Sequence, residues 1–328
     1  MDISSRFLPC LALKDGVDSD KPLTLLIIPE KKAIACNDMV ETMKNSSIFA
    51  TQQGWVLVHD GMSTFLLNPL NSEHRVQLPQ LPKTLPRFST CLLSGKPSHP
   101  KCSVLLVEPV APVFWVSTAA WSDGRVPTAA WSGGSAHHRA AHAPTAKRFG
   151  GRRVPPGEKL PIYPIACCGG KFYFNGTADE LGVLEFCPAP VFSKIKISGV
   201  IDGFFGYMNC SHVYLVESDN ELYMACTLFG FDLKTIYEVR VYKMDFSQQR
   251  WSRVEELGDR TFLVSPYYFG ASYSAEKHGL EPNCVYLACP GEKCYKIYNI
   301  KDGTSKVENV DEAPVSDRAL WILPTEQP

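Results

Sequence analysis

The sequence predicts an all-β protein, and more specifically a β-propeller of short antiparallel blades. Runs of about four to eight apolar, aromatic or β-branched residues recur between turn signals along most of the chain. Helical periodicity is scarce. Several strand pairs also repeat one pattern, in which an aromatic-rich strand is followed by Asn or Asp, a few polar residues and a second strand. A β-sandwich or a pair of β domains would leave a similar trace in these features.

The predicted strands follow one another from the first third of the chain to its end. In order, they are residues 54–60, 63–69, 102–109, 171–176, 212–218, 221–229, 237–246, 283–289 and 293–300. The best helix candidate is residues 37–45, where Asn37 is suited to cap a short helix that carries Met39, Val40 and Met43 on one side.

The repeated hairpin pattern is clearest in the stretches that begin at Thr64, Val241 and Lys296. In these stretches Asn68, Asp245 and Asn299 stand where a side chain can hydrogen-bond its own backbone and start a turn. Degenerate hairpins at loose spacing are typical of propeller blades.

Composition indicates a folded protein without a strong overall charge. The 328 residues are 45% hydrophobic and 11% aromatic, and the net charge is -1. A nearly neutral chain has no overall field that would attract nucleic acid or an anionic membrane, so we expect neither partner.

Cysteine usage and the N-terminus bear on the compartment. The chain has 12 cysteines, none in a CxxC motif, and its length makes a disulfide scaffold unnecessary. The N-terminus lacks the pattern of a secretory signal, and the apolar run at 23–28 is too short to span a bilayer. We therefore expect free thiols and a cytoplasmic or nuclear location.

One stretch carries a family resemblance. Residues 246–288 contain Trp251, then the turn Glu256–Arg260, the segment Ser272–Ala275 and the strand that begins Asn283. Together with 46–81 and 166–186, this stretch resembles the plant KIB-type β-propeller family, long catalogued as a domain of unknown function. The resemblance covers residues 7–112 and 158–323. It implies a KIB-type domain at 7–323, interrupted at 116–157, and a C-terminal tail at 324–328.

The resemblance also implies a function. Many members of this family are F-box proteins, in which an N-terminal F-box docks on the Skp adaptor of a cullin ubiquitin ligase and the propeller holds the substrate. Only six residues precede the propeller-like region here, so we expect no F-box. The resemblance still implies that the propeller binds an unidentified protein partner. It also implies an indirect link of this protein to a Skp–cullin ligase.

Residues 116–157 differ from the chain around them, because they are rich in Ala, Gly, Arg, Pro, His and Ser and repeat "TAAWS". One interpretation is a flexible basic loop. A second is a loop for nucleic acid or an acidic partner, which would use Arg139, Lys147, Arg148, Arg152, Arg153, Trp121 and Trp131. The favoured third interpretation is out-of-frame or intron sequence, which predicts a disordered segment and an incomplete blade.

Metal binding is the first chemistry to weigh. The candidate ligands are His137, His138 and His142, or Cys284, Cys289 and Cys294. The histidines lie in the atypical segment, and the spacing of five predicts that Cys289 faces away from the other two cysteines. We expect exposed histidines and buried thiols, with no metal site and no cofactor.

Catalytic motifs are equally weak. There is no GxSxG elbow, the Cys167–Cys168 pair has no local base, and "GGK" at 169–171 is interpreted as a hairpin turn. Glu255, Glu256 and Asp259 are interpreted as a solvated turn. No catalytic or binding residue is predicted.

Four aromatic residues have two possible roles, as anchors of a protein interface or as packing within a blade: Tyr267, Tyr268, Phe269 and Tyr273. The sequence therefore predicts a non-enzymatic, protein-binding propeller. The alternatives are a truncated or frame-disrupted product that folds poorly, and a propeller-type hydrolase.

Overall fold

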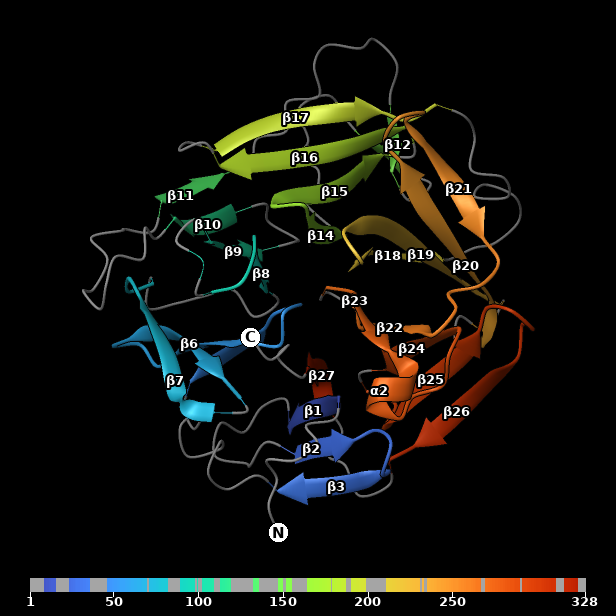
Figure 1. The fold of residues 1–328 in the computed structure, drawn as a ribbon, viewed down its shortest axis with the longest axis horizontal. Coiled ribbons are helices and arrows are strands. Elements are labelled where there is room, and N and C mark those ends of the chain that lie inside the picture. The colour runs from blue at the N-terminus through green and yellow to red at the C-terminus, as the bar shows by residue number, and fades with distance from the viewer. Residues whose placement is uncertain are drawn as a thin grey trace.

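The computed structural model describes most of the chain. The described residues are 9–15, 24–35, 46–69, 71–81, 89–97, 99, 102–108, 113–118, 132–135, 147–149, 152–154, 164–177, 179–186, 190–198, 211–230, 232, 235–266, 269–289, 291–310 and 316–323. Nearly all the regular structure in these residues is β-strand, and the small sheets are arranged as a β-propeller (Figure 1). The predicted fold class is therefore confirmed, as are all nine predicted strands.

Each blade is one sheet, and four blades come from consecutive strands. The first contains β4 (Ser47–Ala50), β5 (Val56–His59), β6 (Thr64–Asn68) and β7 (Asn71–Leu78). The second contains β8 (Thr90–Leu93), β9 (Ser103–Glu108), β10 (Val113–Thr118) and β11 (Ser132–Ser135). The third contains β14 (Ile165–Cys168), β15 (Lys171–Thr177), β16 (Glu180–Phe186) and β17 (Pro190–Lys196). The fourth contains β18 (Ser211–Ser218), β19 (Glu221–Phe229), β20 (Ile236–Asp245) and β21 (Arg250–Val254).

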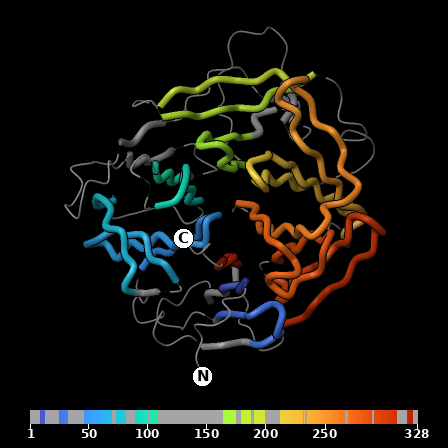
Figure 2. The backbone as a smooth tube through the Cα atoms, viewed as in Figure 1, coloured from blue at the N-terminus to red at the C-terminus, as the bar shows by residue number. Residues whose placement is uncertain are grey.

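The ring is closed by a blade that combines both ends of the chain. Its strands are β27 (Ser316–Ile322), β1 (Cys10–Asp15), β2 (Thr24–Ile27) and β3 (Lys32–Ala35), and β27 pairs antiparallel with β1. The inner strands contact one another in the order β27, β4, β8, β14, β18 and β23, and β24 of that last blade contacts β27 again. Figure 2 shows the red end of the tube beside the blue start at the centre of the ring.

The remaining blade has five strands, in the order β23, β22, β24, β25 and β26. They are β22 (Arg260–Val264), β23 (Ala271–Ser274), β24 (Cys284–Cys289), β25 (Cys294–Asn299) and β26 (Ser305–Asn309). β22 pairs in parallel with β24, whereas the other pairs in this blade are antiparallel. A parallel pair needs a long connection, and here β23 and the short helix α2 (Ala275–His278) lie between the two strands in the chain.

Position within a blade explains the sequence of each strand. The inner strands β8 and β14, and the second strand β5, are buried along their whole length, because neighbouring blades cover both of their faces. Outer strands such as β17 and β26 are mostly exposed. Continuous apolar runs therefore mark inner strands, and polar sequences are tolerated at the rim.

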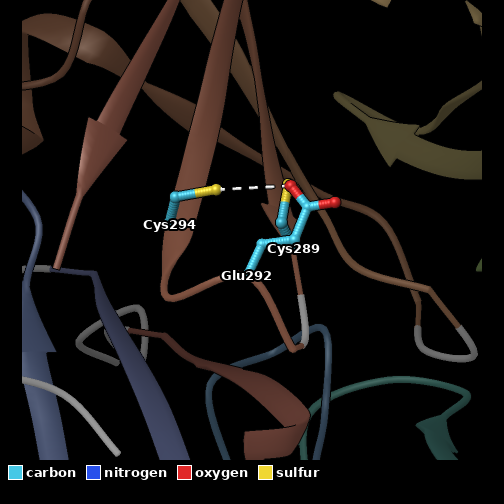
Figure 3. A group of neighbouring side chains, drawn as sticks. All are labelled: Cys289, Glu292 and Cys294. Atoms are coloured by element: carbon cyan, nitrogen blue, oxygen red, sulfur yellow. Dashed lines mark hydrogen bonds between the residues drawn. The ribbon is translucent and has the colours of Figure 1, made fainter. Parts of the chain in front are cut away.

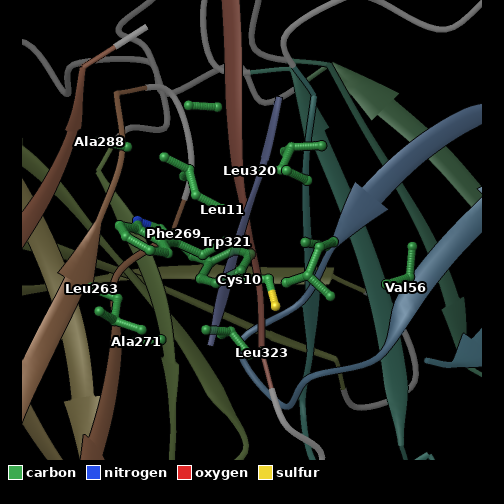
Figure 4. Packing of buried hydrophobic residues seen from close by; sticks show 14 of the residues in the cluster. Cys10, Leu11, Val56, Leu263, Phe269, Ala271, Ala288, Leu320, Trp321 and Leu323 are labelled. Atoms are coloured by element: carbon green, nitrogen blue, oxygen red, sulfur yellow. The ribbon is translucent and has the colours of Figure 1, made fainter. Parts of the chain in front are cut away.

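The largest core cluster lies where the closing strands meet the inner strands (Figure 4). Trp321 is 1% exposed, and its indole Nε1 donates a hydrogen bond to the Val264 carbonyl at 2.9 Å. Ser265 Oγ donates to the Ala319 carbonyl at 2.8 Å. These two bonds attach β27 to the end of β22, in the adjacent blade.

A single side chain joins three blades near the ring centre. Gln52, in the turn between β4 and β5, donates from Nε2 to the Gly270 carbonyl at 3.1 Å. Its Oε1 accepts a hydrogen bond from the backbone N–H of Cys167 at 3.2 Å. The Tyr273 hydroxyl lies 3.5 Å from the Gln52 carbonyl oxygen.

Two of the predicted hairpin turns are formed as expected. Asp245 Oδ1 accepts from the N–H groups of Ser247 and Gln248, at 2.9 and 3.0 Å. Asn299 Oδ1 accepts from the N–H of Lys301 at 2.9 Å. Side chains that satisfy the turn backbone in this way make the hairpins locally stable.

The blade next to the atypical segment has four paired strands, where the sequence predicted an incomplete blade. β11, from within that segment, pairs with β10, and β12 (Lys147–Phe149) pairs with β13 (Arg152–Val154) as a separate ribbon. An outermost strand needs backbone pairing more than apolar side chains, which explains how "SGGS" fills this place. The prediction of disorder falls mainly on 119–131 and 136–146, outside the described residues.

Other predictions also fall outside the described residues, including the helix at 37–45 and the tail at 324–328. Among the helices that the structure describes, none has the length and apolar character to cross a membrane.

Candidate functional site

The most exposed large apolar side chain among the described residues is Met62, at 86%. It lies in the turn Asp60–Ser63, which connects the second and third strands of the β4–β7 blade. Asp60 Oδ1 accepts from the N–H groups of Met62 at 2.8 Å and Ser63 at 2.6 Å, and Oδ2 accepts from Ser63 Oγ at 2.8 Å. The turn therefore presents a flexible thioether on a backbone that is already ordered.

The hydrogen bonds of this turn favour the ionised form of the Asp60 carboxyl. The N–H of Ser63, followed by that of Met62, holds the pKa of the Asp60 carboxyl below its usual range. Gly61 has φ 86° in this turn, a conformation that favours glycine. Ionised Asp60 is therefore part of what keeps Met62 in place at neutral pH.

Contacts beneath the turn hold it to the blade. His59 Nδ1 and Thr64 Oγ1 are 2.9 Å apart where β5 and β6 meet the turn, and both residues are buried. Gln80 Nε2 donates to the Gly61 carbonyl at 3.1 Å. The segment that follows β7 thus supports the turn from the side.

The equivalent connection on the β18–β21 blade, between β19 and β20, leads directly into a second exposed side chain, an aromatic one at the start of β20. The N–H of Thr235 donates to Asp232 Oδ1 at 2.9 Å between β19 and β20. Tyr237, two residues further on, is 63% exposed. We use the term "docking turns" for Asp60–Ser63 and the β19–β20 connection with Tyr237. Protein interfaces are enriched in aromatic and methionine side chains.

The hairpin of β24 and β25, the third and fourth strands of the five-stranded blade, contains a cluster of thiol and carboxylate groups. The Sγ atoms of Cys289 and Cys294 and a carboxylate oxygen of Glu292 all lie within 4.8 Å of one another (Figure 3). Cys294 Sγ is 3.7 Å from Glu292 Oε2. Cys294 is buried, and Cys289 is half-buried.

The prediction that Cys289 faces away from the other two cysteines was right for Cys284 and wrong for Cys294. Cys289 and Cys294 are directly opposite in the β24–β25 ladder, so they share a face of the sheet. Cys284 lies on the other face of β24 and packs in the central core cluster. The prediction counted alternation through positions 290–293, where the chain reverses direction and alternation does not apply.

Burial keeps the thiols of the hairpin protonated at neutral pH. It raises the pKa of Cys289 and of Cys284 to about 12, and it also raises the pKa of Cys294. The adjacent pair Cys167 and Cys168 is buried in the same way, and burial raises the pKa of Cys168 to about 11. No disulfide is present among the cysteines that the structure describes.

Two comparisons place the chain among known proteins. A family model described as the KIB1-4 β-propeller matches residues 25–307. The chain belongs to the KIB1-4 β-propeller family. An F-box protein of Arabidopsis thaliana is 25% identical to it over 103 residues, which is 31% of this chain and 24% of that protein. The match thus spans about a quarter of the relative's length.

Solved structures resemble the KIB1-4 propeller only loosely. AztD of Citrobacter koseri has a TM-score of 0.34 at 10% identity and covers 96% of this chain and 98% of its own. The complex of KlAtg21 with the coiled coil of AgAtg16 has a TM-score of 0.33 at 10% identity, covering 72% and 64%. These scores support no functional argument.

Residues 246–288, the stretch that carries the family resemblance, contribute contacts that hold the structure together. Asp259 accepts from Ser274 Oγ at 2.6 Å and from the N–H of Glu276 at 2.9 Å, so it helps to cap α2. Arg260 pairs with Asp219 of the neighbouring blade. Asn283 Oδ1 accepts from the N–H of Leu257 at 2.6 Å. These residues fix the unusual five-stranded blade.

The acidic group near this turn is engaged in surface contacts. Glu256 accepts from Lys301 Nζ at 2.8 Å, and Glu255 is 3.1 Å from Arg253 Nε. The glycines of "GGK", Gly169 and Gly170, have φ 56° and 76° in the turn between β14 and β15. The hairpin-turn interpretation of this motif agrees with the structure.

The structure shows the role of two of the four aromatic residues that were left open between interface anchors and blade packing. Phe269 is 1% exposed and Tyr273 is 9% exposed, so both pack within the propeller. Tyr267 and Tyr268 lie outside the described residues, as do His137, His138, His142, Arg139, Trp121 and Trp131. Met62 and Tyr237 were not singled out from the sequence. The turn signal "DGMS" is the feature that identifies Met62 as exposed.

Proposed function

We propose that this KIB1-4 propeller binds a protein partner and that the docking turns form part of the binding surface. The observation that carries the proposal is Met62, a fully presented apolar side chain on a turn ordered by Asp60. An ordered turn loses little conformational entropy on binding, which favours affinity. Tyr237 supplies a second anchor of the type that interfaces prefer.

The F-box relative suggests the pathway in which the bound partner would be used. The Arabidopsis relative is an F-box protein, so we propose that the partner is recruited toward a Skp–cullin ubiquitin ligase, directly or through another subunit. We also propose that the chain has no catalytic chemistry of its own. Burial raises the pKa of Cys284 and of Cys289, which makes both thiols poor nucleophiles in the metal-free chain and supports that view. A cytoplasmic or nuclear location is part of the same proposal.

Affinity capture tests the proposal. The tagged chain would be expressed in plant cells, cross-linked, captured and analysed by quantitative mass spectrometry. Met62→Glu and Tyr237→Ser would be compared with Val307→Glu, because Val307 is also exposed, at 55%, but lies on the rim strand β26. We expect at least one protein whose recovery falls about tenfold or more with Met62→Glu, as for an interface hot spot.

The other outcomes separate the parts of the proposal. Equal recovery of every captured protein with Met62→Glu and Val307→Glu would contradict the docking turns. A Skp adaptor or cullin in the capture would support the link to a ubiquitin ligase. Recovery of chaperones alone would contradict the binding function.

A further inference from the structure

We propose that the β24–β25 hairpin binds one Zn²⁺ ion through Cys289 Sγ, Cys294 Sγ and the Glu292 carboxylate, with water in the fourth position. The three ligand atoms come from one hairpin and already lie within 4.8 Å of one another. Two sulfur ligands favour Zn²⁺ over Mg²⁺ and Ca²⁺, which prefer oxygen.

The positions of the ligands suit a tetrahedral site. Zn–S bonds of about 2.3 Å and Zn–O bonds of about 2.0 Å place neighbouring ligand atoms about 3.3–3.8 Å apart. Cys294 Sγ and Glu292 Oε2 are 3.7 Å apart in the structure. Cys289 reaches the site by side-chain rotation, because it is directly opposite Cys294 in the ladder.

The backbone of the turn holds these side chains together. The N–H of Glu292 donates to the Cys289 carbonyl at 3.2 Å, which closes the turn. Gly291 and Lys293 have φ 84° and 48°. The N–H of Val310 donates to the Lys293 carbonyl at 2.8 Å, which ties the turn to the chain beyond β26. The ligands therefore approach the ion from a preformed hairpin.

A neighbouring cation balances the charge of the occupied site. Two thiolates and one carboxylate carry three negative charges and Zn²⁺ carries two positive charges, which leaves one negative charge. Lys296 Nζ is 3.2 Å from Glu292 Oε2, and its side chain is 11% exposed. Lys296 thus supplies the remaining positive charge beside the ligands. The Glu292 side chain is 42% exposed, so water can reach the ligands and take the fourth position.

Cobalt substitution tests the site on the full chain. The protein would be purified with a phosphine reductant, stripped of metal and titrated with Co²⁺, whose thiolate complexes absorb by charge transfer. We expect one equivalent to bind, with a sulfur-to-cobalt band that one equivalent of Zn²⁺ abolishes. Cys289→Ser and Cys294→Ser should lose the band, and Glu292→Gln should weaken Co²⁺ binding at least tenfold.

Controls keep the test decisive. Cys284→Ser removes a thiol from the opposite face of the same strand and should keep the band. Glu292 is exposed on the turn, so Glu292→Gln leaves the core intact, and circular dichroism would verify the fold of each variant. Absence of the band, or a band that survives in both Cys289→Ser and Cys294→Ser, would overturn the proposal. So would a Cys289–Cys294 disulfide in the metal-free protein that persists under the reductant.

Discussion

Replacement of Trp321 by Phe tests how the ring is closed. Trp321 is 1% exposed on β27, and its indole N–H is bonded to the carbonyl of Val264, which is itself 0% exposed. Phe keeps the aromatic packing but leaves that carbonyl without its donor, at a cost of about 1–3 kcal/mol. The smaller ring adds about 1 kcal/mol for the space it leaves. The free energy of unfolding should fall by about 2–4 kcal/mol.

Urea unfolding followed by tryptophan fluorescence and circular dichroism measures this loss. Trp251→Phe is the matched control, because Trp251 is half-buried on the rim strand β21. We expect the control to change the unfolding free energy by less than about 1 kcal/mol. Equal losses for the two variants, or a Trp321→Phe protein as stable as the parent, would refute the role assigned to this hydrogen bond.

Three further predictions concern the core. Gly270→Ala should cost about 1–3 kcal/mol, since its Cβ would lie 2.4 Å from Val216 Cγ2, whereas Gly95→Ala meets nothing within 4 Å and should be nearly neutral in thermal melts. Gln52→Ala should lower stability by about 1–3 kcal/mol in urea unfolding, because it removes bonds to two other blades. Burial lowers the pKa of His278 below 6.5. The stability that neutral His278 contributes is therefore present above that pH and is lost as the pH falls. His278→Gln should make the melting temperature depend less on pH between about pH 7 and 5.

Local features of the fold were predictable from the sequence. Inner strands such as β8 and β14 are apolar along their whole length, because blades cover both faces. Turn residues such as Asp245 and Asn299 can be predicted from their residue type and from their position after a strand. Each of these signals depends only on neighbours in the chain.

Long-range features were not predictable in this way. The pairing of β27 with β1 joins the two ends of the chain, and no local pattern encodes it. The parallel pairing of β22 with β24 likewise depends on the path of the connection between them. The cluster at Cys289 and Cys294 was missed because the turn between them reverses the chain, which strict alternation ignores.

The atypical segment gives a further lesson about rim strands. Polar "SGGS" at 132–135 was predicted to lack structure, yet its backbone pairs with β10. Hydrophobicity predicts which strands are inner strands, but the outermost strand of a blade is held mainly by its backbone hydrogen bonds. Composition alone therefore underestimates strand content at the rim.

The most direct test of the proposed function is hydrogen–deuterium exchange of the chain, free and in complex with the partner captured from plant cells. The account predicts slower exchange on binding in Asp60–Ser63 and in the β19–β20 connection before Tyr237, with β17 and β26 unchanged. Protection confined to those rim strands, with no change in the docking turns, would contradict it.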